Sequence, residues 1–508
     1  MEGVIGMAKI NIILGPPGTG KTHNLLNVVQ KELANGTPPD RIGFVSFTRK
    51  AANEAISRAT AKFNLTEKDF PYFSTLHAFG KRQMGYTKAE IMDAQDYHEF
   101  AEKYGVQLKK ISMDWDDTGV IKTDNKYLRD INKAKMKDME LQDYYNESNL
   151  EYAWNELLWA YRSFEEYKET YNKYDFTDML VQYHAFGPVP KLDVVIVDEA
   201  QDLTKLQWKI CEKIWDKAER VYISGDDDQA IFRWAGADIE HLIRMEGNVS
   251  VLNQSYRCPK AVHDVAADIV TRISNRRTKE WKARDVEGEV RYHAYPGGVN
   301  VRDGNWLILA SAAYMLNEVE EDIRYQGLPY TVNGKSPIRP EILRAVDAWE
   351  RLSRGSEVNY TDVGYIYDNL KVGNNLQRGF KNKKSFNNGE EKNTWSMNDL
   401  KNNHGLINEH VPWDIAFNSM GESNKSYVMA LQKHGGLTAD PKINMSTIHV
   451  AKGGECDNVM LLTDLSRAAQ EEMEKDSDDT NRVFYVGATR AKESLHIINN
   501  QRDRGFIL

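Results

Sequence analysis

Short apolar runs that end at or next to small or acidic residues recur along the N-terminal half of the chain. They lie at residues 10–14, 42–47, 194–197 and 221–224, and polar or helix-forming sequence follows each of them. Continuous apolar runs of this length are typical of strands buried on both faces of a parallel sheet. The first half of the chain therefore predicts an α/β domain.

A second set of apolar runs predicts a second α/β domain. It lies at residues 306–310, 443–448, 459–463 and 495–498. Two stretches of different character interrupt the two sets, and in the first of them aromatic residues and leucines recur every three or four positions over 151–171. That spacing predicts a helix with one buried face.

The chain of 508 residues is long enough for three or four domains. We expect an α/β fold with two parallel-sheet domains, each with a largely helical inserted subdomain. The expected boundaries are 1–84 and 171–250 for the first parallel-sheet domain, 85–170 for its insertion, 251–334 and 441–508 for the second parallel-sheet domain, and 335–440 for its insertion.

Composition excludes several classes of protein. No apolar run approaches the ~20 residues of a membrane span, and we find no targeting signal. The cysteines, Cys211, Cys258 and Cys456, form no CxxC pair, which argues against a disulfide framework or a zinc site. The net charge of −9 confines any nucleic-acid path to local surfaces. Basic clusters lie at 272–284 and 378–384, and we interpret both as solvated faces.

One glycine-rich segment, GPPGTGKT, fits the phosphate-binding pattern GxxxxGK[ST]. A predicted strand precedes it and a helical sequence follows, as this loop requires. Its glycines let backbone N–H groups surround phosphates, Lys21 can reach the β- and γ-phosphates, and the Thr22 hydroxyl can ligate Mg²⁺. The expected nucleotide ligands are Gly15, Pro16, Pro17, Gly18, Thr19, Gly20, Lys21 and Thr22.

Two adjacent carboxylates, Asp198 and Glu199, follow the apolar run at 194–197. We expect Asp198 to hold Mg²⁺ together with Thr22, and Glu199 to polarise the water that attacks the γ-phosphate. With the phosphate-binding loop upstream, this pair predicts hydrolysis of a nucleoside triphosphate.

Further motifs follow in an order that resembles the UvrD/Rep/PcrA group of superfamily 1 helicases. They are FVSFTRKAANEA (44–55), STLHAF (74–79), YDFTDML (174–180), ISGDDDQAIFRWAGA (223–237), LNQSYRCP (252–259), MSTIHVAKGGE (445–455) and FYVGATRAKESLHI (484–497). The GDxDQ-x-I-aromatic-x-W pattern is the most specific, because it separates this group from RNA-type relatives. The resemblance implies two RecA-like domains that bind ATP–Mg²⁺ in the cleft between them.

The resemblance also implies roles for single residues. Gln229 would sense the γ-phosphate, and Arg257 and Arg490 would stabilise charge on the transferring phosphoryl group. Tyr256 would stack on adenine, and Glu455 would contact the ribose. For DNA, the implied stacking residues are Phe47, Phe232 and Trp234, and the implied phosphate contacts are Thr48, Arg49, Thr75, His77 and His449.

The function implied by the resemblance is an ATP-dependent helicase that moves 3′-to-5′ on single-stranded DNA and unwinds duplexes in replication, repair or recombination. Its expected partners are single-stranded DNA, single-strand/duplex junctions, and replication or repair proteins, with no membrane. We expect a monomer in the cytoplasm of a bacterium or of a virus-infected bacterium.

Three alternatives remain open at this stage. The chain could be a translocase that strips proteins from single-stranded DNA without processive unwinding, a nucleotide-switched ATPase, or an RNA helicase. Departures from the family pattern bear on ligands: Ala235 replaces a usual basic residue, and only fourteen residues precede Gly15, where a glutamine segment for adenine is usual. Adenine specificity is therefore not predicted.

Overall fold

The computed structural model describes residues 8–46, 49–109, 111–112, 122–381, 393–409, 411–417, 420–501 and 503–508. The chain forms two compact units. Unit 1 consists of Met1–Glu287 together with Glu472–Thr489, and unit 2 of Gly288–Glu471 together with Arg490–Leu508. None of the helices in the described ranges is both long and apolar enough to cross a membrane.

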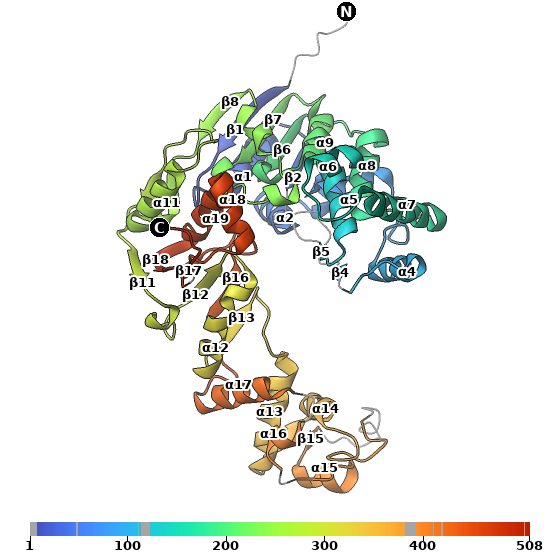
Figure 1. The fold of residues 1–508 in the computed structure, drawn as a ribbon, viewed down its shortest axis with the longest axis vertical. Coiled ribbons are helices and arrows are strands. Elements are labelled where there is room, and N and C mark those ends of the chain that lie inside the picture. The colour runs from blue at the N-terminus through green and yellow to red at the C-terminus, as the bar shows by residue number, and fades with distance from the viewer. Residues whose placement is uncertain are drawn as a thin grey trace, which may run out of the picture. The chain divides into compact units, whose positions relative to one another are not determined.

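A parallel sheet of six described strands forms the centre of unit 1 (Figure 1). In spatial order the strands are β3 (Phe73–Thr75), β2 (Ile42–Ser46), β6 (Val194–Asp198), β7 (Arg220–Gly225), β1 (Lys9–Leu14) and β8 (Asn248–Val251). The carboxyl ends of parallel strands share one edge of a sheet. The phosphate-binding loop after β1 and the acidic pair at the end of β6 therefore lie at the same edge, with β7 between their strands.

Helices cover both faces of this sheet, as the side chains of β6 demonstrate. Val194 and Ile196 pack with α1 and α2, whereas Val195 and Val197 pack with α3, α8 and α9. Successive side chains of a strand point to opposite faces, so a strand covered on both sides must be apolar throughout. Outside the insertion, the described helices of unit 1 are α1 (Lys21–Ala34), α2 (Arg49–Phe63), α3 (Leu76–Met84), α8 (Phe176–Phe186), α9 (Lys205–Trp215), α10 (Ile239–Arg244), α11 (Lys260–Thr271) and α19 (Asp478–Ala488).

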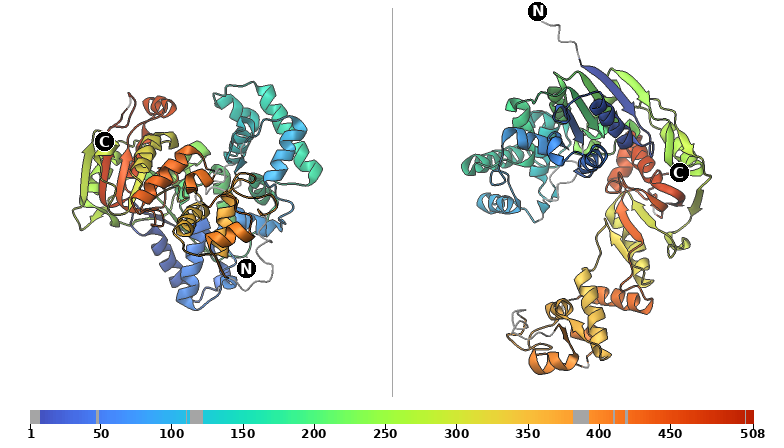
Figure 2. Two further views of the ribbon diagram at one scale, coloured as in Figure 1. Left: turned by 90° about the horizontal axis from the view of Figure 1, so that it is seen from below. Right: turned by 180° about the vertical axis from the view of Figure 1, so that it is seen from behind.

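Helices of the first insertion gather beside the sheet of unit 1 rather than on it (Figures 1 and 2). They are α4 (Ala94–Tyr104), α5 (Lys126–Met136), α6 (Leu141–Glu147) and α7 (Trp154–Tyr171), with a short hairpin of β4 (Ile111–Ser112) and β5 (Lys122–Thr123). In α7, Leu157, Ala160, Phe164 and Tyr167 are buried at the predicted helical spacing. The interpretation of 151–171 as a helical core face is confirmed.

Unit 2 contains a second parallel sheet of six described strands. Their order is β11 (Glu289–His293), β18 (Ala491–Ile498), β17 (Cys456–Leu462), β12 (Trp306–Ala310), β16 (Ile443–Thr447) and β13 (Tyr330–Val332). The other elements are α12 (Asn317–Tyr325), α13 (Pro340–Ser353), α14 (Tyr360–Asn369), α15 (Met397–Asn403), α16 (Trp413–Ala416), α17 (Glu422–Lys433), α18 (Arg467–Lys475) and the pair β14 (Val358–Asn359) and β15 (Thr394–Trp395). One apolar core continues from Ile308 and Met445 in the sheet to Trp349 and Val363 in the insertion.

The predicted fold class, α/β with two parallel-sheet domains and largely helical insertions, is confirmed. The compact units are divided differently from the predicted domains. Residues 251–287 and 472–489, which we expected in the second parallel-sheet domain, make most of their contacts within unit 1. A division of the chain by contacts is not a test of which segments make up each parallel-sheet domain. The predicted domain boundaries therefore stay a prediction.

Candidate functional site

The loop between β1 and α1 has the backbone geometry of a phosphate-binding loop. Gly18 and Gly20 adopt φ values of 72° and 78°, a region that favours glycine. The Lys21 side chain folds back over Gly15, so that its Nζ donates to Gly15 O at 3.0 Å and a Cβ on Gly15 would lie 2.1 Å from Lys21 Cγ. Thr19 Oγ1 donates to Pro16 O at 2.7 Å. The first N–H groups of α1 face the loop without partners inside the helix, which suits an anion.

Asp198 and Thr22 form a pair of oxygen donors beside this loop. Thr22 Oγ1 donates to Asp198 Oδ2 at 3.3 Å, and Asp198 is almost fully buried. Burial and the adjacent Glu199 carboxylate raise the pKa of Asp198 to about 7, although Lys21 opposes them. A buried carboxylate with this much uncompensated charge, next to a hydroxyl, fits a hard divalent cation such as Mg²⁺.

The rest of the metal environment also fits Mg²⁺. In the described part of the chain, no group of three or more His, Cys, Asp or Glu side chains could hold a metal ion by itself. Mg²⁺ in nucleotide sites is usually held by one or two protein groups together with phosphates and waters. The pair of Thr22 and Asp198 therefore suffices as the protein's share.

Hydrogen bonds connect Glu199 to Gln229 through two side chains. Gln201 Nε2 donates to Glu199 Oε2 at 2.6 Å, and the Asp226 N–H donates to Gln201 Oε1 at 3.0 Å. Gln229 Nε2 then donates to Asp226 Oδ2 at 2.6 Å. Glu199 itself adopts φ 53°, a left-handed conformation that costs a non-glycine residue about 1 kcal/mol. The expected base and the expected γ-phosphate sensor thus belong to one network.

Strand β9 (Gln254–Pro259) lies directly on the phosphate-binding loop within unit 1. Ser255 Oγ donates to Pro17 O at 2.8 Å, and the Tyr256 N–H donates to Gly18 O at 2.8 Å. A Cβ on Gly18 would lie 2.4 Å from the Cβ of Arg257, so this close approach requires glycine. The Tyr256 ring is 72% exposed, as a residue that stacks on a base must be. Both Tyr256 and Arg257 are therefore beside the loop.

Three expected site residues, Arg490, Glu455 and His449, belong to unit 2. Arg490 is buried, and its Nη1 donates to Gly454 O at 3.1 Å. The Cys456 N–H donates to Arg490 O at 3.0 Å, so Arg490 lies against the segment that contains Glu455. His449 lies in the turn after β16.

The candidate DNA residues have different surroundings. Trp234 is 52% exposed and meets Phe232 edge-on, with ring centroids 6.5 Å apart. Thr75 instead caps α3 by accepting from the Ala78 N–H at 3.3 Å, and the buried His77 ring stacks on Phe176 at 3.8 Å. Thr75 and His77 therefore have structural roles whatever else they bind.

Three further candidates for DNA contacts, residues 47–49, follow β2 in the sequence. Phe47 and Thr48 lie outside the described residues, and Arg49 begins α2.

Sequence reasoning missed a cluster of buried charges around Asp226–Asp228. Lys279 and Arg276 form ion pairs with these aspartates, and Arg482 of α19 donates to the carbonyl of Asp227. Both Arg276 and Lys279 come from the basic cluster that we interpreted as a solvated face, so for these two residues the interpretation was wrong. The available signal was a run of three acids followed about fifty residues later by a run of bases, but no local spacing links the two runs.

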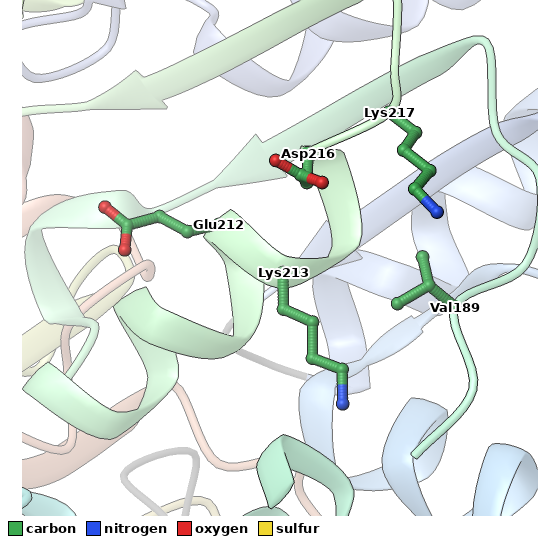
Figure 3. Close-up of a pocket in the computed structure, with 5 residues that line it drawn as sticks. All are labelled: Val189, Glu212, Lys213, Asp216 and Lys217. Atoms are coloured by element: carbon green, nitrogen blue, oxygen red, sulfur yellow. The ribbon is translucent and has the colours of Figure 1, made fainter. Parts of the chain in front are cut away.

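A separate hollow of about 390 Å³ lies on unit 1 at the end of α9 (Figure 3). Its lining residues are Val189, Glu212, Lys213, Asp216 and Lys217. In Figure 3 the Glu212 carboxylate points away from Lys213, whose Nζ donates to the carbonyls of Tyr183 and His184 at 2.9 and 2.8 Å. None of the expected site residues lines this hollow.

Comparison with known proteins gives two family matches and several relatives. Residues 3–250 match the UvrD/REP helicase N-terminal domain, and residues 442–498 match the UvrD-like helicase C-terminal domain. A probable DNA helicase II homolog of Mycoplasma capricolum is 21% identical, with 100% of this chain and 84% of that protein covered. One from Rickettsia conorii is 23% identical, with 97% and 91% covered. The ATP-dependent DNA helicase PcrA of Bacillus subtilis is 23% identical, with 71% and 49% covered.

The two matched segments together span more than half of the chain, and they include the six described strands of the sheet in unit 1, except the last residue of β8, and strands β16, β17 and β18 of the sheet in unit 2. The N-terminal match contains the phosphate-binding loop, the acidic pair and the loop of Gln229, and the C-terminal match contains Glu455 and Arg490. The chain belongs to the UvrD/Rep-like family of helicases.

Proposed function

We propose that this chain is an ATP-dependent DNA helicase that moves 3′-to-5′ along single-stranded DNA and unwinds duplexes in replication, repair or recombination. Family membership supports helicase activity on DNA. The observation that carries the proposal is the network from Glu199 through Gln201 and Asp226 to Gln229, at the edge where Lys21 and Asp198 also lie. Such a network joins the expected base to the expected phosphate sensor.

Nucleotide binding would use the phosphate-binding loop and the two oxygen donors beside it. The backbone of residues 15–20 would surround the phosphates, and Lys21 would exchange its contact with Gly15 O for phosphate oxygens. Thr22 and Asp198 would hold Mg²⁺, which when bound offsets the negative charge of the phosphates. Tyr256 would stack on the base, and Glu455 would contact the ribose.

Hydrolysis requires a water aligned with the γ-phosphate and donors for the charge that develops. We assign the first task to Glu199, because Gln201 fixes its carboxylate and its backbone is held in an uncommon conformation. Gln229, Arg257 and Arg490 would supply the donors. The contact of Arg257 Nη1 with Thr489 O, at 3.4 Å, supports a link between Arg257 and the segment that leads to Arg490.

Single-stranded DNA would stack on aromatic side chains close to Gln229, the expected γ-phosphate sensor. Trp234 and Phe232 follow Gln229 within five residues, so base stacking and phosphate sensing use one short segment. Stacking is worth about 1–3 kcal/mol per base and tolerates any sequence, as a motor requires. Thr75, His77, His449 and residues 47–49 would lie along the phosphate backbone.

The proposed partners are single-stranded DNA, its junctions with duplex DNA, and replication or repair proteins. We propose that the chain acts as a monomer. We also propose that it acts in the cytoplasm of a bacterium or of a virus-infected bacterium, because the relatives named above are bacterial proteins.

Steady-state ATP hydrolysis tests the proposal, measured with no nucleic acid, single-stranded DNA, duplex DNA or single-stranded RNA at one salt concentration. We expect strong stimulation by single-stranded DNA alone. Duplexes with a 3′ or a 5′ single-stranded tail then test unwinding and polarity, and only the 3′-tailed duplex should open. Equal rates in all four hydrolysis reactions would contradict the DNA motor, and stimulation without unwinding of either duplex would favour a translocase that removes proteins.

A further inference from the structure

Three consecutive aspartates, Asp226, Asp227 and Asp228, occupy the loop after β7, and all three are buried. A single ammonium group contacts all of them. Lys279 Nζ lies 3.1 Å from Asp226 Oδ1 and 2.9 Å from Asp228 Oδ2, and it also pairs with Asp227. The Lys279 side chain is only 1% exposed. Charges withdrawn from water this completely are tolerated only with such partners.

Burial disfavours the charge on Lys279, but the three carboxylates outweigh burial and raise the pKa of Lys279. Burial alone would likewise raise the pKa of Asp226, but Lys279 and then Lys21 lower it. Both groups are therefore ionised at neutral pH, and each depends on the other for its charge.

Two arginines hold the same loop from other directions. Arg276 forms a two-pronged contact with Asp228, with Nε and Nη2 at 2.7 and 2.6 Å from its oxygens. Arg482 of α19 is fully buried, and it donates to the carbonyl of Asp227 at 3.0 Å and to that of Asn275 at 2.6 Å. Neither arginine is bonded to the Asp226 carboxylate in these contacts. Among these three basic residues, Lys279 is therefore the one that forms an ion pair with Asp226.

Asp226 is where the loop meets the hydrolytic network. Its Oδ2 accepts from Gln229 at 2.6 Å, and its N–H donates to Gln201, which in turn donates to Glu199 at 2.6 Å. The position of Asp226 therefore sets the position of both expected catalytic side chains.

Lys279 is also connected to the strand that carries Arg257. Three residues later the chain enters β10 (Lys282–Arg284), which pairs in parallel with β9. The Lys282 N–H donates to Asn253 O at 2.6 Å. A fixed Lys279 thus restrains the pairing partner of β9.

We propose that Lys279 is a positioning residue for ATP hydrolysis: its ammonium group fixes Asp226, and through Asp226 it orients Gln229 and, by way of Gln201, Glu199. This inference rests on the proposed function. Lys279 touches neither nucleotide nor water in this role, and it acts through the geometry of other residues.

The test compares Lys279→Met, Gln229→Ala and the double variant by kcat and KM for ATP at saturating single-stranded DNA. Lys209→Met is the matched control, because Lys209 is a half-exposed lysine in unit 1 that pairs with Asp138 in a surface contact. We expect Lys279→Met to lower kcat roughly 10- to 100-fold, as small misplacements of catalytic groups do. KM should change less than about threefold.

The double variant distinguishes positioning from general damage. If Lys279 acts through Gln229 and Glu199, the loss of kcat in the double variant should be clearly smaller than the product of the two single losses, since residues acting as a unit are not additive. Losses in kcat that multiply, or a Lys279→Met rate within about threefold of the control, would overturn the inference.

A second double variant tests whether Lys279→Met is slow only because it is unfolded. In Lys279→Met/Asp227→Asn one buried charge is removed with the lysine, while Asp226 and its bonds to Gln229 and Gln201 remain. We expect the melting temperature to recover toward that of the wild type while kcat stays low. Full recovery of kcat would mean that Lys279 serves only to balance charge.

Wild-type rates separate failure of this inference from failure of the proposed function. A wild-type chain without DNA-stimulated hydrolysis would refute the proposed function. A stimulated wild type whose Lys279→Met variant is equally fast would refute only the role of Lys279.

Discussion

Unit 1 contains two buried clusters of lysines and acids that use the same chemistry for different purposes. The first, the sensor cluster, is Lys279 with Asp226, Asp227 and Asp228. The second, the scaffold cluster, joins α5, α7 and α8. It consists of Lys135, Lys168, Glu165, Asp175 and Asp178.

The two clusters differ in what fixes the acids. In the scaffold cluster, Asp175 caps α8 by accepting from the Asp178 N–H at 2.8 Å, and Lys168 bonds Asp175 at 2.9 Å and Asp178 at 2.5 Å. A regular helix holds these acids whether or not the lysines are present. In the sensor cluster the acids lie in one short 3₁₀ turn, Asp227–Gln229, which Asp226 caps by accepting from the Asp228 N–H at 3.2 Å. A single 3₁₀ turn holds its side chains less firmly than the 11-residue helix α8, so the ammonium group contributes more to their positions. Removing a lysine should cost stability in the scaffold cluster and catalytic geometry in the sensor cluster.

The largest effect should come from a substitution of Glu199, the expected base, to which the sensor cluster is connected through Gln201. Glu199→Gln keeps the shape of the side chain but cannot accept a proton, so we expect kcat for ATP to fall about 10²- to 10⁴-fold while nucleotide binding is retained. Single-turnover hydrolysis and binding of a fluorescent ATP analogue measure the two quantities. The exposed Glu246→Gln serves as control, and a normal rate for Glu199→Gln would remove Glu199 from the reaction.

The scaffold cluster should respond in stability instead. Lys168→Met leaves buried acids without one of their two ammonium partners, and we expect a loss of about 3–5 kcal/mol in the stability of unit 1. Urea unfolding measures the loss. At a temperature where the variant remains folded, its kcat should stay within about twofold of the wild type, and a large fall in kcat there would erase the distinction between the clusters.

A smaller effect is expected from a substitution of Trp234, the exposed aromatic residue that follows the Asp226–Asp228 loop in the sequence. Trp234→Ala should weaken binding of single-stranded DNA by about 1–3 kcal/mol, roughly 5- to 150-fold, while the rate without DNA is unchanged. Trp159→Ala is a matched control, because Trp159 is 47% exposed on α7 of the insertion and Trp234 is 52% exposed. Equal losses of affinity in both variants would exclude Trp234 from the DNA path.

The smallest effect concerns a partly buried pair of histidines in unit 2, His293 and His496. His293 Nε2 and His496 Nδ1 are 3.0 Å apart, with Arg291 and Glu289 on the same strand and Trp306 edge-on to His496. Burial, with His293 and Arg291 acting in the same direction, lowers the pKa of His496 below 6.5.

The sign of the pH dependence follows from that shift. Below about pH 6.5 the unfolded chain takes up a proton that folded His496 resists, so stability is lost as the pH falls. Melting temperatures at pH 7.5 and 5.5 should therefore differ more in the wild type than in His496→Asn. The same difference in both proteins would assign the effect to other groups.

Strands covered on both faces were predictable from the sequence, and edge strands were not. The apolar run at 306–310 coincides with β12, and the runs at 10–14, 194–197 and 221–224 lie within β1, β6 and β7. All residues of β8 are exposed, and β11 has only exposed and half-buried residues, so neither strand shows a continuous apolar run in the sequence. Edge strands pair through their backbones, which a hydrophobic pattern does not record.

The same limit applies to the site. Residues 15–22 and the pair Asp198 and Glu199 form local motifs whose spacing reflects the chemistry, and the structure brings them together at one edge of the sheet. Lys279 lies 52 residues beyond Asp227, and only the folded chain brings them into contact. The sequence does not show which acidic and basic side chains contact each other in the folded protein. Residues of a buried ion pair that are far apart in the sequence therefore look like residues of a solvated face.

Unit 1 also depends on the order in which the chain is made. The helix that inserts the buried Arg482 into it, α19, is separated by unit 2 from the rest of unit 1 along the sequence. At about 5–20 residues per second, a ribosome needs roughly ten seconds or more after Glu287 to reach Glu472. Until then the carbonyls of Asp227 and Asn275 lack their guanidinium partner. A chain interrupted in translation before this helix therefore lacks the Arg482 contacts that hold the Asp226–Asp228 loop.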